Sequence, residues 1–252
     1  MNPVHEIHRR SAKRARSPAA AVAGPSAPAA ARVIALQRAA GNRATARALM
    51  RTPKEISVER TDAAVERTGT PHNWRANFSA ELSTTELTLT IRAKLEPERD
   101  VTDAEVDAVK KQASAEFKRI FDSKFVVSED GGKTERLVRV NVEFVVDKRP
   151  HVLIKLYRGA KEDNRRNWFV SSPAITRAHE LGHQLGLFDE KLDPAYENRK
   201  TEKSKGVHTD NSIMGDYPKE GPTKATAKLR HGKSIIDEVG KAFGKTFTVR
   251  MK

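Results

Sequence analysis

The sequence predicts one α/β (α+β) domain over residues 53–252, preceded by a basic N-terminal tail. Apolar and polar residues alternate over 87–95, which is typical of a half-buried strand. Apolar residues then recur at helical spacing over 106–120. With 252 residues, 37% of them hydrophobic, the chain can form one core of ordinary size, and a second full domain is not expected.

Composition limits the class of protein. No apolar run approaches the roughly 18 residues of a membrane span, so we expect a soluble protein. The chain has no cysteine, so any metal must be bound by His, Asp or Glu. The apolar piece 19–24 is too short for a secretory signal, and no adequate hydrophobic region follows Arg9-Arg10 as a twin-arginine export signal requires.

Positive charge is concentrated at the N-terminus. Of the formal net charge of +14, residues 1–51 carry +9, from ten Lys/Arg and one Glu, and the remainder carries only +5, from 37 basic and 32 acidic residues. Residues 1–30 are rich in Ala, Pro, Arg and Ser, and we expect them to be disordered. Residues 31–52 place apolar side chains among arginines, which predicts a short amphipathic docking segment or, alternatively, a capping helix or solvated linker.

Within the domain over 53–252, the first predicted element is the strand over 87–95. Thr102 and Glu105 form a capping-box pattern ahead of the helix whose apolar face covers 106–120. Two further strands are predicted over 138–146 and 152–156.

Residues 168–170 can form a short edge strand. Pro173 then stands where the first turn of a helix tolerates proline, and this helix is predicted to run to about Leu187. A final helix, roughly Thr226 to Phe243, has an apolar face that predicts packing behind the helix that starts after Pro173.

The helix after Pro173 carries the residues with the clearest chemistry. His179 and His183 are four positions apart and project from one face, so both can bind a single metal ion. Glu180 is rotated off that position, which places its carboxylate near a water on the metal as a general base. The alternative is a pair of unrelated surface histidines, but the apolar flanks predict a buried helix whose polar side chains need a partner such as a metal.

A third ligand is expected just after this helix. Gly186 permits a sharp turn that returns the chain to the metal, and Asp189 follows three positions later. A ligand from a later helix is disfavoured, because the stretch that holds Glu197 and Glu202 is rich in Lys/Arg and lacks helical apolar periodicity. The other candidates that remain open are Glu190, Asp193, Glu197, His208 and Asp210.

These residues, His179, Glu180, His183, Gly186 and Asp189, resemble the extended zinc motif of metzincin peptidases. The last position departs from most metzincins, which have His there, although Asp is a competent zinc ligand. The resemblance implies one catalytic Zn²⁺ and a twisted sheet with a backing helix, an active-site helix, a C-terminal helix, and an edge strand that binds extended substrate.

Two downstream segments extend the resemblance. Residues 211–215, Asn-Ser-Ile-Met-Gly, resemble the methionine turn beneath the metal of metzincins, and Tyr217 stands near a position where some families keep a tyrosine that assists the oxyanion. The offset of Tyr217 is not the commonest one, and packing within a loop is its alternative role. Residues 186–190 also resemble the Gly-Leu-x-Asp-Glu form of bacterial toxin-associated metallopeptidases.

The segment Leu36–Ala44 resembles the Leu-Gln-Arg-x-x-Gly-Asn-x-Ala element found before toxin or peptidase domains in cargo of bacterial extracellular contractile injection systems. This resemblance implies a protein made in the bacterial cytoplasm and then secreted or injected into target cells. The docking segment would bind the injection particle.

The sequence therefore predicts a monomeric zinc endopeptidase acting on protein or peptide substrates, as a delivered toxin or effector. A metal-binding interaction module with weak catalysis is one alternative, and the intact Glu180 argues against it. A basic nucleic-acid-binding protein is the other, and scattered lysines without interleaved aromatic residues argue against it.

Overall fold

A computed structural model describes residues 52–65, 69–129, 132–161 and 163–252. The predictions of a disordered tail over 1–30 and of a docking segment over 31–52 lie outside the described residues, apart from Thr52. Within the described ranges, no helix is both long enough and apolar enough to cross a membrane.

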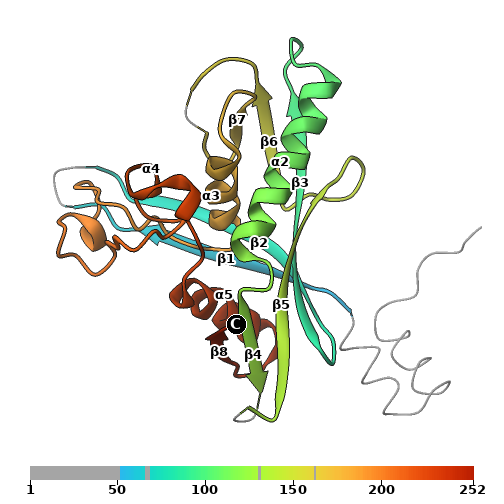
Figure 1. The fold of residues 1–252 in the computed structure, drawn as a ribbon, viewed down its shortest axis with the longest axis vertical. Helices are drawn as coiled ribbons and strands as arrows, with labels where there is room; N and C mark the ends of the chain where they lie inside the picture. The colour runs from blue at the N-terminus through green and yellow to red at the C-terminus, as the bar shows by residue number, and fades with distance from the viewer. Residues whose placement is uncertain (1–51, 66–68, 130–131, 162) are drawn as a thin grey trace, which may run out of the picture. The chain divides into compact units, whose positions relative to one another are not determined.

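The described residues form a mixed α/β fold, which confirms the predicted class (Figure 1). The main order of the sheet is β1-β2-β3-β5-β4-β8, with β6 beside β3 and β7 beside β6. The β3–β5, β3–β6 and β6–β7 pairs are parallel, and the other pairs are antiparallel. The strands are β1 Lys54–Asp62, β2 His72–Leu82, β3 Glu86–Pro97, β4 Phe125–Glu129, β5 Thr134–Phe144, β6 Val152–Tyr157, β7 Asn167–Phe169 and β8 Thr248–Met251.

The long strand β3 divides the sheet into two arms. Its carbonyls at Arg92 and Ala93 accept hydrogen bonds from His151 N (2.7 Å) and Val145 N (2.9 Å), and successive carbonyls of a strand point to opposite edges. The chain leading into β6 therefore continues along the edge of β3 that β2 occupies earlier. Figure 1 shows the consequence: β1 and β2 leave in one direction, and β6 and β7 in another.

The helices are α2 Asp103–Phe121, α3 Ala174–Gln184, α4 Tyr217–Glu220 and α5 Leu229–Phe243. The predicted capping box is confirmed, because Thr102 Oγ1 accepts from Glu105 N and the Glu105 carboxylate accepts from Thr102 N. The predicted apolar face is buried too, and α2 packs against α3 and β5. It is thus the helix that supports α3 from behind.

Two predicted helix limits were wrong. The helix α3 ends at Gln184 instead of about Leu187, because Gly186 adopts a φ of +84° that reverses the chain. The helix α5 begins at Leu229 instead of Thr226, because the backbone of Thr226 bonds to Asn211 and Ile213 at 3.0 Å each.

The strands β1, β2, β4 and β8 were not predicted. In β1 the inward positions are Ile56, Val58, Arg60 and Asp62. The last two are polar, so the apolar alternation is too short to indicate a strand.

Candidate metal centre

The helix α3 brings His179, Glu180 and His183 together in its buried part. Their ligand atoms lie within 4.8 Å of one another, and all three residues are buried. The two imidazole rings are 4.8 Å apart and nearly perpendicular, at 89°. This group could hold a metal ion.

Both histidines are oriented by backbone carbonyls. The Nδ1 atom of His179 lies 2.9 Å from Ile213 O, and the Nδ1 atom of His183 lies 2.8 Å from Leu187 O. Because a carbonyl oxygen can only accept, each Nδ1 carries the proton, which leaves an Nε2 lone pair free in a neutral ring. This is the arrangement that neutral, metal-binding histidines use.

Asp189 joins the two histidines from the turn that follows α3. Its Oδ1 atom lies 3.1 Å from His179 Nε2 and 3.6 Å from His183 Nε2. The same oxygen is buried without an aligned hydrogen-bond donor. None of these three atoms donates a hydrogen to another, so each keeps a lone pair available. Their spacing therefore fits one shared cation better than a chain of hydrogen bonds.

The turn that delivers Asp189 depends on Gly186. Its positive φ of +84° strains any residue with a side chain, and a Cβ there would lie 3.2 Å from Arg60 Nη2. Arg60 also holds the turn by donating from Nε to Gly186 O at 2.8 Å. The sequence prediction of a glycine-dependent turn is confirmed.

A buried arginine holds the outer oxygen of Asp189. Arg199 Nη2 lies 3.8 Å from Asp189 Oδ2 and donates to Asp62 Oδ2 at 2.6 Å, while Nη1 reaches Asp193 at 3.3 Å. Sequence reasoning missed this residue, because Arg199 stands in a stretch rich in Lys and Arg whose exposed members look the same in sequence.

Glu190 is turned away from the cluster. Arg230 donates to both of its oxygens at 2.6 Å, His231 Nε2 lies 3.0 Å from Oε1, and Ser212 donates to Oε2. Burial would raise the pKa of Glu190, but these hydrogen bonds outweigh it and hold the pKa well below its ordinary value. His231 is thus a buried partner of Glu190.

The other open candidates for the third ligand make different contacts. Asp193 pairs with Arg199 at 3.3 Å, and Glu197 pairs with Lys200 at 2.7 Å. Asp210 pairs with Arg230 at 2.8 Å. His208 is linked to this region through its backbone, since its N donates to Glu190 O at 3.0 Å. Of the candidates, Asp189 is the one that the structure brings to both histidines.

Glu180 faces the same pocket as the histidines. This pocket has a volume of about 460 Å³, and its lining includes His179, Glu180, His183, Asp189 and Arg165. The Glu180 carboxylate is 4.0 Å from His179 Nε2, farther than that of Asp189. Burial raises the pKa of Glu180 to about 7, and the charge of Asp189 acts in the same direction.

The segment 211–215 packs under α3. A Cβ at Gly182 would lie 2.7 Å from Met214 Sδ, so the glycine in the middle of α3 leaves room for the fully buried methionine. The Tyr217 ring lies 5.7 Å from that of His179, but its hydroxyl is 3.4 Å from Thr176 Oγ1 and Tyr217 is not among the pocket-lining residues. Burial raises the pKa of Tyr217.

A second buried ion pair ties β7 to α3. Arg177 Nη2 donates to Phe169 O at 2.8 Å, and Asp163 Oδ1 accepts from Phe169 N at 2.8 Å. The two charged groups are 3.8 Å apart and their side chains are fully buried. Sequence reasoning missed both residues, although an arginine on the apolar side of a helix was an available signal.

Comparison of the chain with models of known protein families, with curated proteins and with solved structures finds no match.

Proposed function

We propose that this chain is a zinc-dependent endopeptidase with a metzincin-like domain. The observation that carries the proposal is the convergence of His179 Nε2, His183 Nε2 and Asp189 Oδ1, with the Glu180 carboxylate in the same pocket. Two imidazoles and one carboxylate are a donor set that suits zinc and leaves a position open for water or substrate.

The three converging residues would hold the ion. Bound there, zinc would lower the pKa of a water molecule and polarise the carbonyl of the scissile peptide bond. Glu180 would take a proton from the attacking water and return it to the leaving amine nitrogen. Its burial favours this exchange, since a carboxyl whose pKa lies near 7 both accepts and releases a proton close to neutral pH.

Other residues of the chain would position substrate. Among the described strands, β7 is paired with β6 on one edge, and on its other edge Asn167 bonds to Asn164 while Phe169 bonds to Asp163 and Arg177. An extended peptide would bind along this edge only by displacing the Asn164 bonds. The Asp163–Arg177 pair would keep this edge fixed relative to α3. Tyr217 remains a proposed aid to the oxyanion and would have to turn its hydroxyl away from Thr176.

The biological setting that we propose is an effector loaded into a bacterial contractile injection particle. It rests on the resemblance of Leu36–Ala44 to the cargo element, in a segment outside the described residues.

The test combines metal content with cleavage. Protein purified without chelator should contain one zinc per chain and should cleave peptides, and Glu180→Gln should keep the zinc while losing about 10²- to 10⁴-fold in kcat/KM. Glu202 is exposed, so Glu202→Gln is the matched control and should keep both the bound zinc and the peptide cleavage. Absence of zinc with no uptake on titration would exclude the metal site, and retained turnover in Glu180→Gln would exclude Glu180 as the base.

A further inference from the structure

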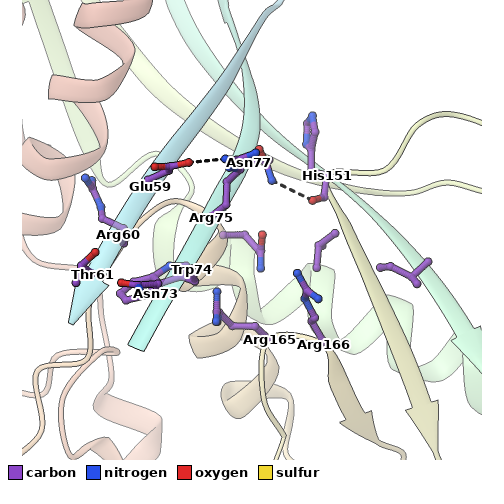
Figure 2. A pocket seen from close by; sticks show the side chains of 13 residues that line it. Glu59, Arg60, Thr61, Asn73, Trp74, Arg75, Asn77, His151, Arg165 and Arg166 are labelled. Carbon is purple, nitrogen blue, oxygen red and sulfur yellow. Dashed lines mark hydrogen bonds and ion pairs between the residues drawn. The ribbon is translucent and has the colours of Figure 1, made fainter. Parts of the chain in front are cut away.

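A second pocket adjoins the candidate metal centre. It has a volume of about 770 Å³ and lies between β2 and the segment that leads into β7 (Figure 2). Three of its lining residues, Trp74, Arg165 and Arg166, also line the pocket that contains the histidines. A ligand in one pocket can therefore extend into the other.

The second pocket is strongly basic. Its lining includes four arginines and one glutamate. Arg60 pairs with Glu238 at 3.1 Å, and Arg75 pairs with Glu59. Arg165 and Arg166 form no ion pair with any described residue, whereas eleven other arginines of the described chain do. Two adjacent guanidinium groups are thus left without an ion-pair contact, and the nearest negative charges acting on Arg165 are those of Glu180 and Asp189 in the neighbouring pocket.

Arg165 is held in place without a carboxylate. Its guanidinium lies over the Trp74 ring, 5.2 Å from the centroid, and Nη2 is 3.0 Å from His72 Nε2. Arg166 is exposed, but its backbone is fixed, since its O accepts from Lys155 N at 2.8 Å. Figure 2 shows both side chains extending in the same direction, toward the strand that carries Trp74 and Asn77. Arg165 is therefore arranged before any ligand binds, and Arg166 stands beside it on a fixed backbone.

We propose that Arg165 and Arg166 form a carboxylate-binding subsite, so that the enzyme selects peptides with an acidic side chain near the scissile bond. This inference rests on the proposed peptidase function. Guanidinium groups bind carboxylates through short, paired hydrogen bonds, and a partly desolvated site strengthens them. The carboxylate at a peptide's C-terminus has the same chemistry and is the other possible source.

The test uses pairs of peptides that differ only as Glu against Gln at each position around the cleavage site, all with amidated C-termini. Zinc-loaded full-length protein should cleave the best Glu peptide about tenfold to a hundredfold faster than its Gln partner. Arg166→Gln and Arg165→Gln should reduce that preference, and Arg99→Gln, an exposed arginine that also forms no ion pair with described residues but lies outside both pockets, should retain it. Equal cleavage of Glu and Gln peptides would overturn the subsite and leave the peptidase intact.

Two further arms complete the test. Because Arg165→Gln could disturb Trp74, Arg166→Glu with Lys-containing peptides provides a charge swap and should invert the preference. A strict need for a free C-terminal carboxylate would show that the subsite binds the chain end instead and would overturn the side-chain assignment.

If no peptide is cleaved, peptidase function fails, and calorimetric binding of the Glu and Gln peptides to Glu180→Gln decides on the subsite alone. If the Glu peptide binds tenfold more tightly than the Gln peptide, and Arg166→Gln abolishes this difference, the carboxylate-binding subsite is supported. Equal binding would refute it.

Discussion

Asp189 Oδ1 lies 3.1 Å from His179 Nε2, yet the two atoms lack the alignment of a hydrogen bond. Other contacts fix the position of each side chain. His179 is oriented through Nδ1 by Ile213 O, and Asp189 is delivered by the Gly186 turn and held at Oδ2 by Arg199. The contact is therefore imposed by the surrounding structure, which is the way that proteins preorganise ligands for an ion.

The first prediction concerns the third ligand. Asp189→Ala should weaken zinc binding by more than about a hundredfold, beyond the range that loss of an outer partner costs. His208→Ala should change it little, because His208 is linked to Glu190 through its backbone. Competition with a chromophoric chelator measures both dissociation constants. A larger loss in His208→Ala would mean that the third ligand is misassigned.

The second prediction concerns pH. In the metal-free protein, burial opposes a charge on His179, but Asp189 outweighs it and raises the pKa of His179, while burial lowers the pKa of His183 to about 4. At a pH below the raised pKa of His179, zinc must displace one proton from this ring. Its apparent affinity should fall about tenfold per pH unit below the raised pKa of His179, with close to one proton released per zinc bound. Calorimetry in buffers of different ionisation enthalpy measures this proton.

The same shift affects stability of the metal-free protein. A raised histidine pKa contributes stability that is fully present below the unfolded value of about 6.5 and is lost as pH rises through the folded value. Asp189→Asn should remove this contribution to stability. It should also move to lower pH the range in which zinc binding releases a proton from His179. An unchanged proton count in Asp189→Asn would show that the proton comes from another group.

The third prediction concerns the buried network around Glu190. Glu190→Ala leaves Arg230 and His231 without their central partner, and breaking a buried pair in this way costs about 3–5 kcal/mol of unfolding free energy. Glu197→Ala, which breaks the exposed pair with Lys200, should change the unfolding free energy by less than about 1 kcal/mol. Urea unfolding of the two variants checks the difference.

The pH dependence of that network has the opposite sign to that of His179. Folding lowers the pKa of Glu190, so its charge stabilises the folded protein at pH values above the ordinary carboxyl pKa of about 4.5. This stabilisation is lost as the pH falls toward the pKa of Glu190 in the folded protein. The stability gap between wild type and Glu190→Ala should therefore narrow in acid. A gap that does not change between pH 7 and 3 would mean that packing, not charge, sets the cost.

What the sequence predicts well is local. The capping box of Thr102 and Glu105 and the helical spacing of His179 and His183 involve residues three or four positions apart, so the pattern and the geometry coincide. The partners of Arg199 and Glu190 are set by tertiary contacts instead. Arg199 and Asp62 are 137 positions apart, and nothing in a single sequence indicates that they meet.

The last prediction concerns residues 1–51. The core of the described residues is formed by side chains between Ile56 and Val249. The net charge of +9 and the Ala/Pro-rich composition end near Thr52. Since segments of such composition contribute few buried contacts, deleting 1–51 should leave the melting temperature and peptide cleavage nearly unchanged while abolishing delivery.

The measurement compares full-length protein, the deletion and a variant in which only 36–44 is scrambled. All three should melt and cleave alike, and only the full-length protein should co-sediment with the injection particles of the producing strain. The scrambled variant is the informative control, because it keeps the length and charge of the tail and so separates recognition of a specific element from attraction by positive charge. A deletion that melts much lower would show that these residues belong to the core of the domain, and particle loading that survives scrambling would refute the role of 36–44.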